Sequence, residues 1–257
     1  MKKPVVGVFG VSGCAGCMLT MLYEDAFKQL SNFLDLRSFP LIKEDKYTGD
    51  FDYAFIEGTV CSDEDIMKLN EIRKRAKKVV AIGSCAALGG VPSAKNFLNQ
   101  EKVMKLVYPK TNQLKSTLPQ PISMHIKVDY SLPQCPPDKK EILEFIQCIL
   151  TGREFKPYEN PVCFECRKKG NKCLLDEGKL CLGPITNGGC NALCPSNKTT
   201  CYGCRGPLKE ANLKAFINLL KEKGFTKKEL HDKMRTFAGL GFGELEEENK
   251  TSRWLEN

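Results

Sequence analysis

The sequence has no long hydrophobic run, and this absence argues against a membrane-spanning helix. No apolar stretch approaches the roughly 18 residues that such a helix needs. The N-terminal residues MKKPVVGVFGVSGCAGC hold two lysines and then a brief apolar run interrupted by glycines. That run is too short for a secretory signal, and a twin-arginine pair is missing. We therefore expect a cytoplasmic protein with no membrane span.

Histidine is scarce, and a glycine-rich phosphate-binding fingerprint is missing. The chain has two histidines, His125 and His231, which stand far apart, so we expect both to be structural or surface residues. No G-x-G-x-x-G run follows a predicted strand, although such a run would cradle the phosphates of a dinucleotide. We therefore expect no nicotinamide or flavin site in this chain.

The chain has more basic than acidic residues, but the basic residues are not clustered. The formal net charge is +8, and the lysines and arginines are interspersed with acids, as in LKEKGFTKKELHDK. This pattern is typical of solvated helix faces rather than of a track that binds phosphates. We expect no nucleic-acid partner.

Cysteine is abundant, with fourteen residues in 257. Disulfide frameworks are rare in a reducing compartment, where metal binding explains a high cysteine content better. The distribution of these cysteines is therefore the main guide to function.

The first part of the chain alternates predicted strands with predicted helices. Short apolar runs predict buried strands, and longer amphipathic stretches predict helices. The strands are expected at 5–10, 51–58, 78–85 and 126–130, and the helices at 17–30, 62–78 and 138–152. Residues 92–121 are expected to form a surface excursion. This order predicts an α/β fold with a doubly wound parallel sheet over residues 1–152.

The character of the chain changes after this region. Eight cysteines lie between Cys163 and Cys204, among many Gly, Asn and Pro residues and with little hydrophobic periodicity. Such a segment cannot build an apolar core, so we expect metal to organise a small domain over residues 153–207. Residues 208–257 are expected to form helices at 208–224 and 226–237, followed by a tail from 241 that is either frayed or docked on a partner.

Four cysteines of the first part follow predicted strands. They are Cys14, Cys17, Cys85 and Cys135. In an open α/β sheet, ligands bind at the carboxyl ends of the strands, so these side chains are expected to meet there. The CAGC motif alone is also typical of a redox dithiol, but the further cysteines in the matching loops favour a four-cysteine metal cluster. Three nearby glycines would let backbone N–H groups approach it, namely Gly13, Gly16 and Gly83.

The eight later cysteines divide into two groups of four, spaced C-x2-C-x6-C-x7-C and C-x3-C-x6-C-x2-C. Two thiolate zinc sites are possible, because zinc accepts four thiolates. Zinc sites usually pair two CxxC knuckles, however, and the Cys194–Pro195 pair is similar to the end of a ferredoxin ligand run. The spacing therefore favours iron–sulfur clusters, with a zinc-stabilised nucleic-acid-binding module as the alternative.

Several motifs together resemble the small, electron-transferring subunit of a [NiFe] hydrogenase. They are SGCAGC, IGSCAALGG, PQCPP, CLGPIT and CYGCRGP, in this order, within residues 4–240. The resemblance is greatest to cytoplasmic sulfhydrogenase delta subunits and to small subunits of F420-non-reducing (methyl-viologen-reducing) and F420-reducing hydrogenases. It implies a flavodoxin-like domain followed by a ferredoxin-like iron–sulfur region.

The resemblance also implies three [4Fe-4S] clusters held by twelve cysteines. The ligands would be Cys14, Cys17, Cys85 and Cys135 for the proximal cluster, Cys163, Cys166, Cys173 and Cys181 for the distal cluster, and Cys190, Cys194, Cys201 and Cys204 for the medial cluster. Electrons would pass between the NiFe centre of a partner large subunit and a flavin or iron–sulfur acceptor subunit. This chain would hold no catalytic residue, because hydrogen is split on the large subunit.

Three positions depart from the family's pattern. The periplasmic branch has His where this chain has Cys163 and Pro where it has Cys194. With cysteine at both, all three clusters are expected to be four-iron clusters of lowered potential, which suits an acceptor such as NAD(P), F420 or ferredoxin. Gln134 stands where the family commonly has Gly, which affects the geometry expected of that loop.

Two cysteines and one acid remain outside the three sets. Cys148 lies in an apolar predicted helix and is expected to be a buried structural thiol, while Cys61 follows a strand and could approach the proximal cluster. Glu57 ends the same strand and is a candidate for relaying protons or for a hydrogen bond to the partner, with ordinary loop polarity as the alternative.

A related iron–sulfur subunit of complex I is a rival interpretation. Its family has adjacent cysteines in the first motif and lacks a segment like 163–204.

Overall fold

The computed structural model describes residues 3–22, 25–42, 47–108, 110 and 117–248. The chain divides into two compact units, Met1–Lys156 and Pro157–Asn257, which we describe separately. None of the described helices is long and apolar enough to cross a membrane.

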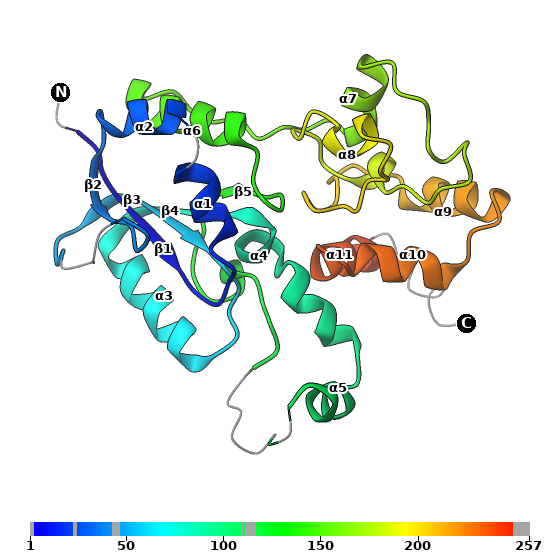
Figure 1. Ribbon diagram of the computed structural model, residues 1–257, viewed down its shortest axis with the longest axis horizontal. Helices are drawn as coiled ribbons and strands as arrows, with labels where there is room; N and C mark the ends of the chain where they lie inside the picture. The colour runs from blue at the N-terminus through cyan, green and yellow to red at the C-terminus, as the bar shows by residue number, and fades with distance from the viewer. Residues whose placement is uncertain (1–2, 23–24, 43–46, 109, 111–116, 249–257) are drawn as a thin grey trace. The chain divides into compact units, whose positions relative to one another are not determined.

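The first unit is built on a parallel five-stranded sheet (Figure 1). Its strand order is β2-β1-β3-β4-β5, and the strands are β1 (Val5–Gly10), β2 (Asp35–Ser38), β3 (Phe51–Glu57), β4 (Ala76–Ile82) and β5 (Tyr130–Leu132). In register, Val8 pairs with Phe55, Phe55 with Val80 and Val80 with Tyr130. The central strands are apolar on both sides because both faces of the sheet are covered.

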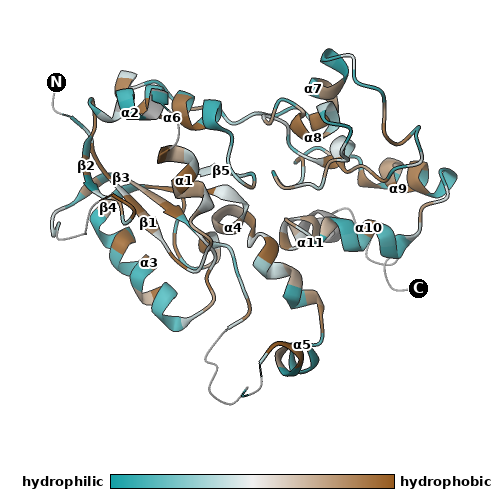
Figure 2. Ribbon diagram, viewed as in Figure 1, coloured by the Kyte–Doolittle hydropathy of each residue, from teal (hydrophilic) through white to brown (hydrophobic). Residues whose placement is uncertain are grey.

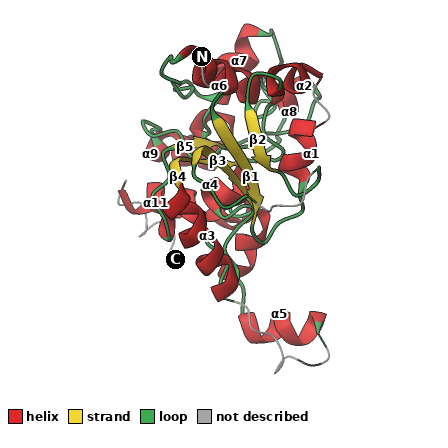
Figure 3. Cartoon of the chain, turned by 90° about the vertical axis from the view of Figure 1, so that its left-hand side faces the viewer, coloured by secondary structure: helices red, strands yellow, loops and turns green. Residues whose placement is uncertain are grey.

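Helices pack on both faces of this sheet (Figure 3). One face carries α1 (Gly16–Leu22), α2 (Asp25–Ser31) and α6 (Lys139–Thr151). There the Phe145 ring of α6 meets the Phe55 ring edge-on, with 5.8 Å between centroids. On the other face, α3 (Asp63–Arg75) buries Leu69 and Ile72. The predicted α/β class and its parallel sheet are therefore confirmed.

Local capping explains where the two long helices begin. The Ser62 side chain accepts a hydrogen bond from the Asp65 N–H at the start of α3, and Asp138 accepts from two backbone N–H groups at the start of α6. Capping oxygens satisfy N–H groups that have no partner within the helix. Gly152 ends α6 in the left-handed conformation. The helix predicted over 138–152 is confirmed, whereas the one predicted over 62–78 ends earlier, because β4 already begins at Ala76.

Several elements differ from the expectations. The short strand β2 was not predicted, and β5 begins only at Tyr130, the last residue of the expected strand 126–130. Cys85 is not in a loop but in the helix α4 (Gly83–Leu88), because Gly83 takes a positive φ of 81° and turns the chain directly into a helix. The excursion over 92–121 contains most of the 3-10 helix η1 (Val91–Phe97) and the helix α5 (Gln100–Val107), and the 3-10 helix η3 (Ile122–Met124) follows it. Residues 109 and 111–116 lie outside the described part.

The second unit combines the cysteine-rich segment with three C-terminal helices. Its elements are α7 (Val162–Lys168), η4 (Gly183–Ile185), α8 (Leu193–Ser196), α9 (Leu213–Glu222), α10 (Lys227–Met234) and α11 (Gly239–Glu248). A capping box opens α10, since Thr226 and Glu229 each accept a hydrogen bond from the other's backbone N–H. Much of α10 is hydrophilic, as Figure 2 shows. Part of the expected tail is helical in α11, and residues 249–257 lie outside the described part.

Candidate metal centres

Four cysteines of the first unit lie at the carboxyl edge of the sheet. Cys14 follows β1, Cys17 lies in α1, Cys85 lies in α4 directly after β4, and Cys135 follows β5. Burial raises the pKa of the Cys17 thiol, and the nearby Glu57, Cys85, Cys135 and Cys14 raise it further. Burial and the neighbouring Cys135 and Cys14 likewise raise the pKa of Cys85, to about 11. The structure thus brings the four predicted thiols within electrostatic reach of one another.

Glu57 lies beside this first set, at the end of β3. Its side chain is only 3% exposed, and Oε1 accepts a hydrogen bond from the Ala15 N–H at 3.2 Å. Burial raises the pKa of Glu57, although hydrogen bonds from the Cys17 and Ala15 backbones oppose the shift. A carboxyl group in this environment holds a proton more readily than an exposed one.

Glycines allow the backbone to approach these thiols closely. A Cβ added at Gly83 would collide with the Cys17 Sγ, and one at Gly90 would lie 2.5 Å from the Cys85 Sγ. Both glycines also have positive φ angles, of 81° and 57°, which disfavour a side chain on independent grounds. Gly83 was predicted to have this role, whereas Gly90 was missed although it stands in the quoted IGSCAALGG motif.

Gln134 has a backbone conformation that normally favours glycine. Gln134 has a φ of +124° and is 7% exposed, and its backbone carbonyl accepts a hydrogen bond from the Ser84 N–H at 3.0 Å. This bond ties the loop of Cys135 to the helix of Cys85. The departure from glycine noted in the sequence therefore falls at a strained position.

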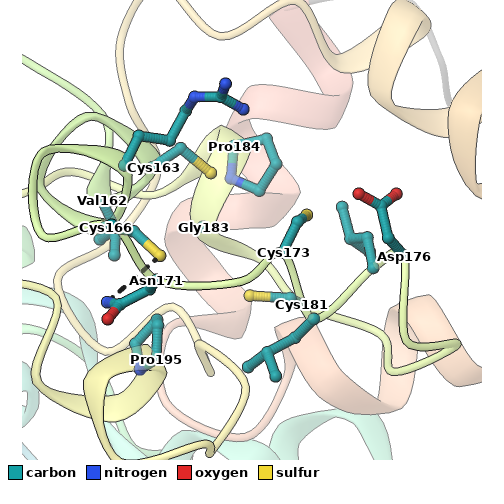
Figure 4. Close-up of a pocket in the computed structure, with 14 residues that line it drawn as sticks. Val162, Cys163, Cys166, Asn171, Cys173, Asp176, Cys181, Gly183, Pro184 and Pro195 are labelled. Carbon is teal, nitrogen blue, oxygen red and sulfur yellow. Dashed lines mark hydrogen bonds between the residues drawn. The ribbon is translucent and has the colours of Figure 1, made fainter.

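The second cysteine set lines a single cavity of about 380 Å³ (Figure 4). All four of its thiols contribute to the wall, namely Cys163, Cys166, Cys173 and Cys181. Burial raises the pKa of Cys163 to about 12, and the other three thiols of the set raise it in the same direction. The grouping that the resemblance implied is therefore also a spatial grouping.

The size and lining of this cavity fit a polynuclear cluster. A water molecule takes about 30 Å³, so the space exceeds what one ion needs. In the described part of the chain, no group of three or more His, Cys, Asp or Glu side chains is arranged to hold a single metal ion. Four thiols around a larger space match the donor set of an iron–sulfur cluster.

Backbone and amide N–H groups point at several sulfurs. The Cys201 N–H donates to the Cys181 Sγ at 3.2 Å, and the Gly203 N–H donates to the Cys201 Sγ at 3.5 Å. The Asn171 side chain donates to the Cys166 Sγ at 3.6 Å. Such donors stabilise negative charge on thiolates and tune the potential of a bound cluster.

Fewer contacts link the four cysteines of the third set, which are Cys190, Cys194, Cys201 and Cys204. Burial strongly raises the pKa of Cys201, and the neighbouring Cys181 and Cys204 add to the shift. Cys201 thus lies near one member of its own set and one member of the second set. Cys190 and Cys194 are placed by the turn between them, where Asn191 and Ala192 have positive φ angles.

Glu165 holds that turn in place. Its carboxylate accepts hydrogen bonds from the Asn191 N–H at 3.0 Å and the Ala192 N–H at 3.3 Å, and lies 3.9 Å from the Cys190 Sγ. Burial and this carboxylate raise the pKa of Cys190. Sequence patterns did not indicate the role of Glu165, because its partner Asn191 lies 26 residues further along the chain.

The cysteines outside the three sets have different environments. Cys148 is 6% exposed within the core against the sheet, so its prediction as a buried thiol is confirmed. Cys61 is half-buried, and its N–H donates to Asp65 Oδ2 at 2.9 Å. His125 contacts the Gln120 side chain at 2.8 Å, which fits the predicted structural role. None of the fourteen cysteines is joined in a disulfide.

Comparison with known proteins finds a matching family and several similar relatives of this chain. Residues 14–149 match the family described as NADH ubiquinone oxidoreductase, 20 kDa subunit. The chain is 34% identical to sulfhydrogenase 2 subunit delta of Pyrococcus furiosus, covering 91% of this chain and 98% of that protein. It is 33% identical to a subunit of the F420-non-reducing hydrogenase vhu of Methanocaldococcus jannaschii, covering 89% of this chain and 91% of that protein.

Similarity to solved structures points to the same kind of protein as these relatives. A chain of an NAD+-reducing [NiFe]-hydrogenase in the H2-reduced state is 30% identical, with a TM-score of 0.53, over 61% of this chain and 97% of that one. An actinobacterial-type NiFe-hydrogenase chain from Ralstonia eutropha shares the fold, with a TM-score of 0.61 and 13% identity over 100% of this chain and 92% of that one.

Proposed function

Because this chain belongs to the family of [NiFe] hydrogenase small subunits, we propose that it relays electrons between the NiFe centre of a large subunit and an acceptor subunit. The observation that carries the proposal is the cavity whose wall holds all four thiols of one cysteine set. Such a chain contributes to hydrogen:acceptor oxidoreduction without splitting hydrogen itself.

The cofactors we propose are three [4Fe-4S] clusters. The first cysteine set would hold the proximal cluster, the set from Cys163 to Cys181 the distal cluster, and the set from Cys190 to Cys204 the medial cluster. When bound, each cluster takes up and releases one electron. The strand order 2-1-3-4-5 supports a flavodoxin-like first domain, because that is the order of flavodoxin.

The side chains of this protein would prepare the sites for these clusters. Burial raises the pKa of thiols in all three sets, so cluster binding must displace protons that the thiols otherwise retain. The N–H groups of Cys201 and Gly203 donate to sulfur and offset the negative charge of thiolate ligands. Glu57 is positioned to hold a proton next to Cys17.

A low-potential electron path is part of the proposal. Cysteine at positions 163 and 194 gives both later sets four thiolates, and at position 163 a thiolate in place of imidazole lowers the cluster potential. We propose a cytoplasmic hetero-oligomer in which a flavin or iron–sulfur subunit passes electrons to NAD(P), F420 or ferredoxin.

The extent of similarity favours a hydrogenase over a complex I subunit. The family match over residues 14–149 leaves out the segment with eight cysteines. The relatives that are aligned over about nine-tenths of this chain are sulfhydrogenase and F420-non-reducing hydrogenase subunits.

The test is anaerobic purification of the complex through a tag on this chain, followed by analysis of iron, acid-labile sulfide, nickel and zinc. We expect about twelve irons per chain, with nickel on a co-purifying large subunit. Zinc in place of iron, without nickel or a large partner, would instead support a zinc-stabilised module.

Two serine variants sharpen this test. Cys173→Ser removes a thiol from the cavity and should reduce the iron content by up to about four per chain. Cys148→Ser changes a core thiol outside the three sets and should leave the iron content unchanged. An equal loss in both variants would show that iron content reports only general folding.

A further inference from the structure

Four exposed cations lie in the segment that forms the thiol-lined cavity of the second unit. They are Arg167, Lys168, Lys169 and Lys172, which we call the basic rim. Arg167 itself lines the cavity, and Lys172 directly precedes Cys173, the most exposed thiol of that set. Lys168 and Lys169 follow Arg167 directly in the chain, so the rim includes residues next to the cavity and next to its most exposed thiol.

The acids of the same segment are already engaged. Asp176 pairs with Lys223 at 2.8 Å, and Glu177 pairs with Lys179 at 2.9 Å. Glu165 accepts backbone hydrogen bonds from the turn after Cys190. Within the described residues, no ion pair or side-chain hydrogen bond involves any of the four rim cations, and all four side chains are exposed to solvent.

We propose that the basic rim is the docking surface for an acidic patch on the redox subunit that accepts electrons from this chain. This inference rests on the proposed function, because it requires a cluster in the cavity beside the rim. One electron would pass from the reduced cluster to the oxidised flavin or iron–sulfur group of the docked subunit, with no bond formed or broken. Complementary charge steers such encounters and fixes their orientation.

Compensation of cluster charge alone does not account for the rim. Exposed charges are screened by water and salt, so neutralising a buried anion is achieved better by a buried cation. Lys233, which is half-buried beside Cys181 and Cys201, already supplies one. The four rim cations are instead exposed together, as expected for a surface that meets an acidic partner.

The experiment reverses the rim charges in the intact complex. The variant Lys168→Glu/Lys169→Glu/Lys172→Glu leaves Arg167, which lines the cavity, unchanged. A matched control, Lys102→Glu/Lys209→Glu/Lys214→Glu, makes the same change in net charge at exposed lysines elsewhere. Each complex is captured anaerobically through a tag on this chain, and the salt concentration that releases each subunit is measured.

We expect the rim variant to release the acceptor subunit at a markedly lower salt concentration, while the large subunit stays bound. Hydrogen-driven reduction of the final acceptor should fall at least about tenfold, whereas hydrogen isotope exchange at the large subunit and iron content stay unchanged. The control variant should behave as the wild type. If the rim variant loses iron, the neutral variant Lys168→Gln/Lys169→Gln/Lys172→Gln is used, with a smaller shift in the same direction expected.

Other outcomes overturn the inference and are distinguishable from failure of the proposed function. If an iron-replete rim variant keeps the acceptor subunit bound as the wild type does, the rim is not the docking surface, but the proposed electron relay still holds. Release of the large subunit instead assigns the rim to that interface. Binding of a single-stranded oligonucleotide that the rim variant abolishes, with electron transfer unaffected, assigns the rim to nucleic acid. A wild-type chain without iron contradicts the proposed function itself.

Discussion

Lys233 places a positive charge between the second and third cysteine sets. Its Nζ donates to Thr200 Oγ1 at 2.6 Å and lies 3.8 Å from the centre of the Tyr202 ring. Burial lowers the pKa of Lys233, while Cys181 and Cys201 act in the opposite direction. A cation held next to a cluster stabilises the reduced, more negative form.

We therefore expect Lys233→Met to lower the midpoint potential of an adjacent cluster by some tens of millivolts, following the Coulomb energy of one charge at partial burial. The measurement is a redox titration monitored by EPR. Lys228→Met is the control, since Lys228 lies on the same helix, is exposed and pairs with Asp232. Equal shifts in the two variants would mean that net charge, and not the position of Lys233, sets the potential.

Gln134 offers a second test at the scale of one residue. Its φ of +124° lies where glycine is favoured. We expect Gln134→Gly to raise the free energy of unfolding by about 1 kcal/mol through relief of this strain, as measured by urea denaturation. Gln134→Ala keeps a Cβ and should give no such gain. A less stable glycine variant would show that the buried side chain contributes more than the strain costs.

At this scale, sequence reasoning succeeds where ligands cluster in short motifs. Cys163, Cys166, Cys173 and Cys181 fall within nineteen residues, and they line one cavity. The residues that support the sites could not be predicted in this way. Lys233 meets Thr200 across 33 positions and Glu165 meets Asn191 across 26, so neither partnership leaves a local pattern.

Among the elements, β5 is fixed to its neighbours by Asp129. Asp129 accepts a hydrogen bond from the Val79 N–H at 2.9 Å and pairs with Arg73 of α3 at 2.8 Å. Burial alone would raise the pKa of Asp129, but the bonds from Val79, Arg73 and Lys78 hold it below the usual value. This anchor sets the path of the chain that leads to Cys135.

We expect Asp129→Asn to reduce the free energy of unfolding by about 2 kcal/mol at pH 7. Because the folded-state pKa is lowered, the contribution of ionised Asp129 is fully present above the unfolded-state pKa of about 3.9 and is lost as the pH falls further. The difference between wild type and variant should therefore shrink between about pH 5 and pH 2. This difference in the free energy of unfolding is measured by urea denaturation at a series of pH values.

The control for this prediction is Glu71→Gln. Glu71 is exposed and its contact with Arg75 spans 3.5 Å, so the change should stay within about 0.5 kcal/mol. A pH-independent difference for Asp129→Asn would mean that the amide disturbs packing rather than removing a favourable charge.

Elements with a strong apolar pattern could be predicted, and those fixed by tertiary contacts could not. Most residues of β1, β3 and β4 are apolar and buried, and the existence of these strands follows from the sequence. β2 has the sequence DLRS, which is short and polar, and it is a strand because it pairs with β1 at the sheet edge. β5 lies later than expected because Asp129 uses its side chain to bond Val79 just before the strand.

Across the whole molecule, the two units reach stability by different means. The first unit has apolar clusters on both faces of its sheet. The second unit begins with a segment of eight cysteines in which regular structure is limited to α7, η4 and α8. Segments of this kind depend on bound metal for their folding free energy. Loss of the clusters should therefore affect the two units unequally.

We expect removal of iron by an anaerobic chelator to open the second unit while the first unit stays folded. Limited trypsin digestion, followed by mass spectrometry, should then show early cleavage among Arg167, Lys168, Lys169 and Lys172, and a persistent fragment ending near Lys156. The iron-replete chain should resist cleavage at the same sites under the same conditions. If cleavage begins instead within the sheet, or if chelation does not alter the pattern, the second unit owes its fold to packing by α9, α10 and α11 rather than to metal.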